Sequence, residues 1–337
     1  MCFFCFQLQS GWRGPAAYPN IPVMIWWSPF TGDDGLQQCG DFQCFVTNER
    51  GHRRHPSTRT IFFYGTEFKP YDLPLPRLPG EDWALLHEES PKNNAIFSHA
   101  PAMELFNHTA TFRQHSHFPL TTQYLEGAAS LASPRYLVPL DQKNRLQAEA
   151  GLAPVAYVQS GCDTPSQRDS WVREFMKHIA VDSYGACLNN KQLPEDLQGS
   201  EQFESERFLH FLAQYKFVIS FENAVCDDYV TEKLWRALTV GSVPVYLGAP
   251  NVEDLLPHKN AAIVVTKFPS PEAVATFVKS VNSDDTLYQT FLQHKSGERS
   301  NDEALIENDL LLNLLERRRY YFTSYYGCLI HIFTGGV

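Results

Sequence analysis

The chain has 337 residues, of which 43% are hydrophobic and 13% aromatic, so it is long enough for two domains with separate cores. This composition excludes a disordered protein. The formal net charge of −10 disfavours general nucleic-acid binding, because proteins that bind phosphate backbones are usually basic. No run of about 20 apolar residues predicts a membrane span.

The first half of the chain is punctuated by prolines and contains short predicted strands. These strands cover residues 21–27, 60–64, 83–87 and 106–112. Residues 29–40 are predicted to form a loop, and residues 70–80, with four prolines, an extended loop. The polar stretch at 141–154 ends in glycine and proline, which is typical of a helix followed by a domain linker.

Beyond this stretch, predicted strands alternate with predicted helices. The strands are at 155–158, 217–220, 243–247 and 261–265, and the helices are at 167–179, 203–215 and 230–240. The alternation predicts a parallel sheet with helices on both faces. Such a sheet binds its ligand at the carboxyl ends of its strands.

A polar segment follows the predicted strand at 217–220 and leads into a predicted helix with one polar face. Tyr229, Glu232 and Lys233 share one side of that helix. Backbone N–H groups and the helix dipole favour anions at a helix N-terminus, so this face is suited to a sugar, a ribose and a phosphate. A solvated, salt-bridged helix face is the alternative.

Other charged residues also stand next to strand ends. Arg168 begins the helix after the strand at 155–158, where its forked donors suit a diphosphate; an exposed surface arginine is the alternative. Glu88 and Glu89 follow the strand at 83–87. A carboxylate there is suited to general-base catalysis if burial raises its pKa, and a solvated acidic loop is the alternative.

Several common motifs are absent. No G-x-G-x-x-G and no G-K-[ST] occurs, which disfavours dinucleotide and P-loop sites. No D-x-D occurs either, and this favours a transferase route that needs no metal. His115 and His117 lack a carboxylate or cysteine at metal-ligand spacing, so no metal site is predicted.

The 8 cysteines do not form paired C-x-x-C motifs, which disfavours structural zinc. Cys39 and Cys44 enclose a short polar loop and are candidates for a local disulfide, which would indicate a secretory compartment. Free buried thiols in a cytosolic protein are the alternative. Asn107 begins an N-x-T sequon and is a candidate glycosylation site, which favours the secretory interpretation weakly.

Three segments resemble the α-1,3-fucosyltransferase family. The segment at 221–248 resembles its donor-binding motif: it reads FEN, then five residues, then YVTEK, then a predicted helix and GSVPVYLG. ESP at 89–91 resembles its acidic segment, and LFNHTATFRQHSHFPL at 105–120 its FN-T-T-R-S segment. Closer details resemble the branch of protein O-fucosyltransferases of the endoplasmic reticulum: WWSP at 26–29, HEESPKNN at 87–94, VDSYGACL at 181–188 and ENAVCDDY at 222–229.

The resemblance implies an α/β fold with two Rossmann-like domains facing a cleft, a GT-B type glycosyltransferase. An acceptor-side domain is expected at 20–150 and a GDP-fucose-binding domain at 151–310, flanked by an atypical N-terminal segment at 1–19 and an atypical C-terminal tail at 311–337. The implied reaction is inverting transfer of L-fucose from GDP-β-L-fucose, with no metal or other cofactor required.

The resemblance also implies residue roles. Glu89 is expected to be the general base, and Arg168 and Lys233 to neutralise the diphosphate. The ribose and fucose are expected to contact Asn223, Tyr229 and Glu232. The expected acceptor-side residues are Glu88, Arg113, His115 and Ser116.

The acceptor is expected to be a Ser or Thr of a secreted protein domain, in the lumen of the endoplasmic reticulum or Golgi. The alternatives are α-1,3-fucosylation of GlcNAc in N-glycans or LacNAc, and a catalytically inactive protein that binds clients or glycans. Family members begin with a membrane anchor or signal peptide, which the start MCFFCFQ does not resemble. The tail LLERRRYYFTSYYGCLIHIFTGGV does not resemble the carboxyl end of the family either, so both ends are expected to be truncated or to come from an alternative gene model.

Overall fold

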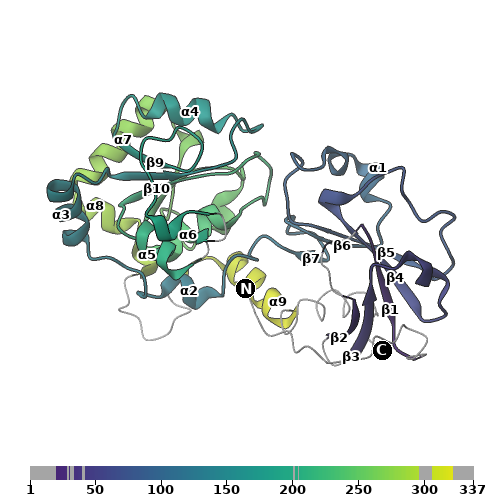
Figure 1. Ribbon diagram of the computed structural model, residues 1–337. Coiled ribbons are helices and arrows are strands. Elements are labelled where there is room, and N and C mark those ends of the chain that lie inside the picture. The colour runs from purple at the N-terminus through teal and green to yellow at the C-terminus, as the bar shows by residue number, and fades with distance from the viewer. Residues whose placement is uncertain are drawn as a thin grey trace.

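The computed structural model describes residues 20–28, 30, 34–39, 42–199, 202–203, 205–295 and 306–321. Within this part of the chain, two α/β units follow one another, each built on its own sheet (Figure 1). We call the unit with strands β1–β7 the first unit and the unit with strands β8–β12 the second unit. No helix of the described residues is both long and apolar enough to cross a bilayer.

The first unit is a seven-stranded sheet in the order β2-β3-β1-β4-β5-β6-β7. Its strands are β1 (Val23–Ser28), β2 (Gly35–Cys39), β3 (Phe42–Thr47), β4 (Thr58–Tyr64), β5 (Asp82–His87), β6 (His108–Thr111) and β7 (Phe118–Pro119). Neighbouring strands are parallel except for β2 and β3, which form an antiparallel hairpin. The central strands are apolar on both faces, and this explains why their sequences read as continuous hydrophobic runs.

The prediction of a loop over residues 29–40 is wrong for residues 35–39, which form β2. This strand lies at the edge of the sheet and is held by its backbone pairing with β3. Its sequence, GLQQC, carries little of the apolar alternation that marks a strand. The extended loop predicted at 70–80 is confirmed, because no helix or strand occurs there.

The second unit is a five-stranded, fully parallel sheet in the order β12-β11-β10-β8-β9. Its strands are β8 (Val155–Val158), β9 (Val181–Tyr184), β10 (Phe217–Phe221), β11 (Val243–Leu247) and β12 (Ile263–Val264). Its main helices are α4 (Arg168–Phe175), α5 (Glu206–Leu212), α6 (Glu232–Val240), α7 (Pro271–Ser283) and α8 (Asp285–Thr290). This arrangement confirms the predicted parallel sheet with helices on both faces (Figure 1).

The faces of the second sheet follow from the alternation of side chains along β10. Phe217 and Ile219 pack in one apolar cluster with residues of α4 and α7. Val218, which points the other way, packs in a second cluster with residues of α5 and α6. The sheet is therefore buried on both faces, and only the ends of its strands are free to carry a site.

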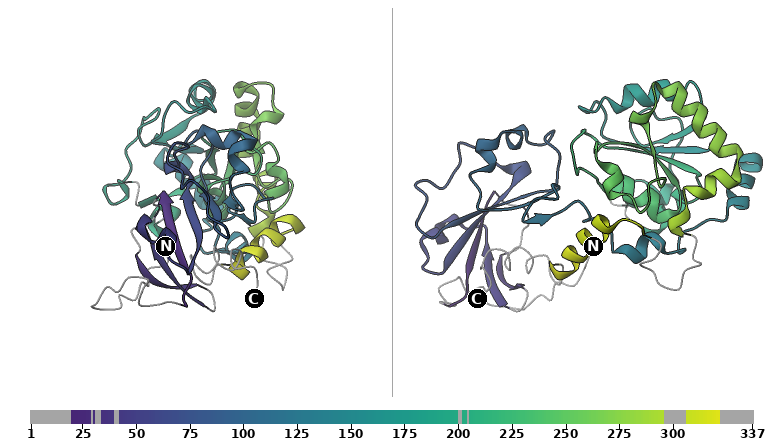
Figure 2. Two further views of the ribbon diagram at one scale, coloured as in Figure 1. Left: turned by 90° about the vertical axis from the view of Figure 1, so that its right-hand side faces the viewer. Right: turned by 180° about the vertical axis from the view of Figure 1, so that it is seen from behind.

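Two helices at the end of the first 150 residues pack against the second unit. They are α2 (Ala128–Ala132) and α3 (Leu140–Ala150), and Lys143 of α3 donates to the carbonyl oxygens of Tyr215 at 3.0 Å and Gly241 at 2.7 Å. The helix α9 (Asp309–Tyr321) lies between the units in Figure 1 and in the right-hand view of Figure 2, with Leu311 and Leu314 in the core of the second unit. The domain boundaries near 150 and 310 stay predictions.

One disulfide joins Cys162, after β8, to Cys187, after β9, with 5.6 Å between the Cα atoms. It ties together two neighbouring loops at the carboxyl ends of their strands. The predicted bond between Cys39 and Cys44 stays a prediction, because the side chain of Cys39 lies outside the described residues.

Candidate active site

The carboxyl ends of the two sheets come together at Glu89 and Tyr229. Glu89 follows β5 of the first unit, and Tyr229 belongs to the loop between β10 and α6 of the second. The Tyr229 hydroxyl donates to Glu89 Oε2 at 3.4 Å, and the Tyr229 ring packs edge-on against Phe112 with 5.0 Å between centroids. Burial, together with Glu222 and Glu89, raises the pKa of Tyr229. The structure thus brings the predicted base to the predicted donor loop.

Glu222 holds the start of α6. Its side chain is fully buried and accepts hydrogen bonds from the Thr231 backbone N–H at 2.8 Å and the Thr231 hydroxyl at 2.7 Å. These bonds satisfy donors that a helix start otherwise leaves open. Burial raises the pKa of Glu222, while the Lys233 ammonium at 3.6 Å opposes that rise. Sequence reasoning assigned no role to Glu222, although it stands in the FEN triplet.

The first turn of α6 carries a compact ion-pair network. Glu232 Oε1 accepts from Lys233 at 2.9 Å and from Arg236 at 3.0 Å. Burial by itself would raise the pKa of Glu232, but Lys233 and Arg236 outweigh it and lower that pKa to about 2. Burial likewise opposes the charge on Lys233, and Glu222 and Glu232 overcome it and raise the Lys233 pKa. Lys233 therefore stays cationic at neutral pH beside a helix N-terminus.

Two predicted donor-binding residues carry buried polar atoms without a partner. Arg168 is 2% exposed and donates to the carbonyl oxygens of Phe221 at 2.9 Å and Gly161 at 2.6 Å. Its Nε is buried and makes no hydrogen bond, and the same holds for Asn223 Oδ1. Buried polar atoms are normally hydrogen-bonded, so these two atoms suit a site that a ligand completes.

Glu88 turns into the first unit, beside Glu89. Its Oε1 accepts from the Tyr64 hydroxyl at 3.0 Å, and its Oε2 is buried without a partner. Burial raises the pKa of Glu88, and burial together with Glu88 raises the pKa of Tyr64 to about 12. The structure therefore places a second carboxyl beside the predicted base.

The other predicted acceptor-side residues lie in the loop after β6. Arg113 Nη1 donates to the Asp227 carbonyl at 2.9 Å, and the Gln114 backbone N–H donates to Asp228 Oδ2 at 3.2 Å. We call these four residues the inter-unit latch, because they join the two units. His115 is exposed and Ser116 is buried with its hydroxyl against Thr111, so their acceptor-side roles stay predictions.

Sequence reasoning also missed Tyr124, which lies on the segment that crosses from β7 to α2. Tyr124 is 38% exposed between the buried residues Thr122 and Leu125. Burial raises the pKa of Tyr124, and the negative charges of Glu232, Glu89, Glu88 and Glu222 act in the same direction. Nothing in the TTQYLE sequence separates this tyrosine from a core residue.

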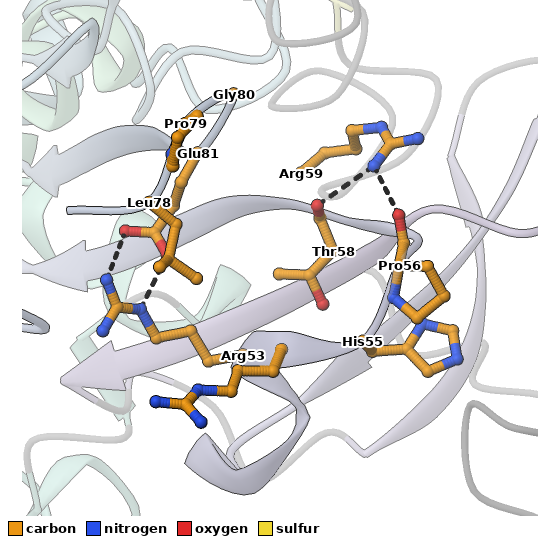
Figure 3. A pocket seen from close by; sticks show the side chains of 10 residues that line it. Arg53, His55, Pro56, Thr58, Arg59, Leu78, Pro79, Gly80 and Glu81 are labelled. Atoms are coloured by element: carbon orange, nitrogen blue, oxygen red, sulfur yellow. Dashed lines mark hydrogen bonds and ion pairs between the residues drawn. The ribbon is translucent and has the colours of Figure 1, made fainter. Parts of the chain in front are cut away.

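A hollow of about 340 Å³ lies elsewhere, at the amino ends of β4 and β5 (Figure 3). Arginines line it, but Arg53 is ion-paired to Glu81 at 2.7 Å and Arg59 donates to the Pro56 carbonyl at 2.8 Å. This hollow is at the opposite strand ends from Glu89 and is separate from the candidate site.

Asn107 is exposed, and its Oδ1 accepts from the Trp83 backbone N–H at 3.0 Å. Its glycosylation stays a prediction. Among the residues that the structure describes, no group of three or more His, Cys, Asp or Glu side chains is placed to hold a metal ion.

Two family sequence models match the chain. The model of glycosyltransferase family 10 (fucosyltransferase), C-terminal part, matches residues 149–313, and the fucosyltransferase N-terminal model matches residues 19–124. The chain belongs to glycosyltransferase family 10. The two matched ranges contain Glu89 and the segment at 221–235, so both sides of the candidate site lie within the family 10 sequence.

Proteins named GDP-fucose protein O-fucosyltransferase 3 are similar to this family 10 chain. The one from Xenopus laevis is 53% identical over 288 residues, which cover 85% of this chain and 61% of that protein. The one from Homo sapiens is 52% identical over 288 residues, covering 85% and 60%. The chain therefore spans about three fifths of the length of these relatives. The predicted resemblance to the fucosyltransferase family is confirmed.

Solved structures of α1,3-fucosyltransferase share the fold of this family 10 chain. The structure with GDP has a TM-score of 0.55 at 15% identity and covers 92% of this chain and 93% of that one. The structure with GDP-fucose has a TM-score of 0.53 at 16% identity, covering 84% and 82%. The predicted GT-B type α/β fold is thereby confirmed.

Proposed function

We propose that this chain is a fucosyltransferase that moves L-fucose from GDP-β-L-fucose to a Ser or Thr hydroxyl of a protein, with inversion at the anomeric carbon. The observation that carries the proposal is the 3.4 Å contact between Glu89 of the first unit and Tyr229 in the donor-loop motif of the second. Membership of family 10 and relatives named GDP-fucose protein O-fucosyltransferase support it.

The reaction is a single displacement. Glu89 accepts the proton of the acceptor hydroxyl, and the acceptor oxygen forms a bond to the anomeric carbon of fucose. The bond between that carbon and the β-phosphate oxygen breaks at the same time. Its electron pair leaves with GDP. Holding both reactants between the two strand ends makes the attack effectively unimolecular.

The second unit supplies the donor site in this proposal. Lys233, at the start of α6, and Arg168 neutralise the diphosphate as negative charge develops on the leaving group. Asn223, Tyr229 and Glu232 hold the ribose and the fucose. The partnerless Asn223 Oδ1 and Arg168 Nε support these roles, because a bound nucleotide-sugar would offer them hydrogen bonds.

The acceptor side is proposed to be the first unit, where Glu88 precedes Glu89 and Arg113 lies in the loop after β6. We propose the lumen of the endoplasmic reticulum or Golgi as the site of action. The disulfide between Cys162 and Cys187 supports a compartment of this kind, because disulfides persist where the environment is oxidising.

The test is to incubate the purified chain with GDP-fucose and, in separate reactions, a disulfide-rich secreted domain or LacNAc. Mass spectrometry of the products is expected to show fucose on a Ser or Thr of the protein domain. Fucose on LacNAc alone would refute the protein acceptor and leave glycan fucosylation. If the chain binds GDP but transfers fucose to neither acceptor, the proposal of an active transferase is refuted and an inactive binding protein is favoured.

A further inference from the structure

The hollow at the amino ends of β4 and β5 is positively charged, although the chain as a whole carries a formal net charge of −10. It is lined by three arginines, Arg53, Arg54 and Arg59, and by one glutamate, Glu81. Figure 3 shows the pair of Arg53 and Glu81 on one side of the hollow and Arg59 on the other. The local charge therefore favours an anion.

The carboxylate of Glu81 is already occupied by neighbouring donors. Glu81 is 7% exposed, and its two oxygens accept from Arg53 Nε at 2.7 Å and Arg53 Nη2 at 3.2 Å. Its Oε1 also accepts from Trp83 Nε1 at 2.7 Å. Arg53 and Glu81 therefore form a fixed wall in which the two charges cancel. Among the described residues that line the hollow, no second carboxylate is present to neutralise the other two arginines.

Arg54 and Arg59 are both exposed, and neither forms an ion pair with a described residue. Arg59 Nη1 donates to the carbonyl oxygens of Pro56 at 2.8 Å and Thr58 at 3.2 Å, which orient the guanidinium without neutralising it. Arg54 makes no hydrogen bond within the described part of the chain. Two guanidinium groups thus keep their charge available to a ligand.

The rest of the hollow adds another donor and apolar surface. His55 Nδ1 accepts from the Ser57 backbone N–H at 3.2 Å, so the neutral ring carries its proton on Nε2 and can donate it in a hydrogen bond to a ligand. Leu78 and Pro79 supply the apolar surface. The volume of about 340 Å³ is at the lower end of the range of small-ligand sites, so an anion and the organic group that carries it both have room.

We propose that this hollow binds a small molecule that carries a phosphate or sulfate monoester. The ester oxygens accept from Arg54, Arg59 and His55, and the organic part packs on Leu78 and Pro79. Both esters offer three terminal oxygens to these three side chains, whereas a carboxylate offers two. Because the hollow is at the opposite strand ends from Glu89, this site is independent of the proposed transferase reaction.

The experiment measures the binding of glucose 6-phosphate, glucose 6-sulfate and uncharged glucose to the full chain, by isothermal titration calorimetry in a buffer free of phosphate and sulfate. The wild type is expected to bind at least one ester and not glucose. Arg54→Gln and Arg59→Gln are each expected to weaken ester binding by about tenfold or more, because each removes a charge-assisted hydrogen bond. Arg54→Lys keeps the charge but loses the fork, and is expected to recover only part of the affinity.

Two control variants locate the binding. Arg145→Gln removes an exposed arginine of α3 that is paired with Asp141, and Lys233→Met removes the cation of the proposed donor site. Both are expected to bind the esters within about twofold of the wild type. Circular dichroism checks that each variant is folded, and Arg54→Gln removes no hydrogen bond to a described residue.

The proposal is overturned if neither ester binds more tightly than glucose. It is also overturned if Arg54→Gln, folded like the wild type, binds the esters as well as Arg145→Gln does. Ester binding that is lost in Lys233→Met and kept in Arg54→Gln would assign the esters to the donor site and overturn the proposal as well.

Discussion

At the scale of single residues, Glu89 is the group whose replacement tests the chemistry most directly. Glu89→Gln keeps the size of the side chain and an oxygen for the Tyr229 hydroxyl, but the amide cannot accept a proton. We expect the rate of transfer to fall by about 100-fold to 10,000-fold, with GDP affinity unchanged. Rate measurements and GDP titration check this, with the exposed Glu104→Gln as control. Turnover near the wild-type rate would remove Glu89 from the role of base.

Lys233 tests the leaving-group side. Lys233→Met keeps the apolar stem but removes the ammonium that pairs with Glu222 and Glu232. GDP affinity is expected to fall by roughly tenfold or more, because a charge-assisted hydrogen bond to phosphate contributes about 1.5–3 kcal/mol. Lys267→Met, which removes an exposed ion pair with Glu253, is the matched control. Equal GDP affinity in the two variants would contradict a contact between Lys233 and the phosphates.

At the scale of elements, α6 is held at both ends by buried polar groups. At its start, Glu222 accepts hydrogen bonds from the backbone N–H and the hydroxyl of Thr231. At its other end, Lys143 donates to the Gly241 carbonyl at 2.7 Å, and Lys295 donates to the Thr239 carbonyl at 2.6 Å. Both lysines are nearly fully buried. The carbonyl oxygens of a last helical turn have no partner within the helix, so the hydrogen bonds from these lysines fix the helix that carries Lys233.

These two lysines predict a pH dependence of stability. Burial lowers the pKa of Lys143 and of Lys295 to about 7, whereas both titrate near 10.5 when the chain is unfolded. Between about pH 7 and 10 the unfolded chain holds more protons, so the free energy of unfolding is expected to rise with pH. The slope is at most about 1.4 kcal/mol per pH unit for each lysine.

Urea unfolding at pH 7 and pH 9 measures this slope. The double variant Lys143→Met, Lys295→Met is expected to be less stable than the wild type, because carbonyl oxygens lose their donors. Its stability should change less between the two pH values. If the wild type and the variant gain the same stability between pH 7 and pH 9, the buried lysines do not cause the pH dependence.

At the scale of the whole molecule, the inter-unit latch sets how the two strand ends face each other. Asp228 is 2% exposed, with φ of 65°, and its carboxylate accepts from the Gln114 N–H at 3.2 Å and Asn251 Nδ2 at 2.8 Å. The next residue along is Tyr229, which contacts Glu89. Asp228 therefore couples the placement of the donor loop to the first unit.

The matched pair Asp228→Ala and Asp227→Ala tests this coupling. Asp228→Ala is expected to lower kcat about tenfold with little change in GDP affinity, because Glu89 and the donor lose their alignment. Asp227→Ala removes an exposed ion pair with Arg113, which contributes at most about 1 kcal/mol, and should be near wild type. A parallel loss of kcat and GDP affinity in Asp228→Ala would indicate a disrupted donor loop and contradict an alignment role.

The sequence predicts several of the strands that are buried on both faces. Strands β5, β8, β10 and β11 were located within about one residue, because two buried faces produce an uninterrupted apolar run. The sequence predicts a loop where the edge strand β2 lies, and it predicts no strand at β3, β7 or β9. Strand β9 has the polar sequence VDSY and is nevertheless buried, because Asp182 accepts hydrogen bonds from Tyr215, Lys191 and the Ala153 N–H. Such partners are distant in sequence and leave no local pattern.

The candidate site also has a part that the sequence predicts and a part that only the tertiary structure shows. The sequence by itself determined the family and the spacing of Tyr229, Glu232 and Lys233, because a helix repeats every 3.6 residues and a motif is local. Only the tertiary structure decided that Glu89 meets Tyr229, 140 positions away. The physical reason is that this contact depends on how two separately folded sheets pack, and no periodicity within either unit encodes that packing.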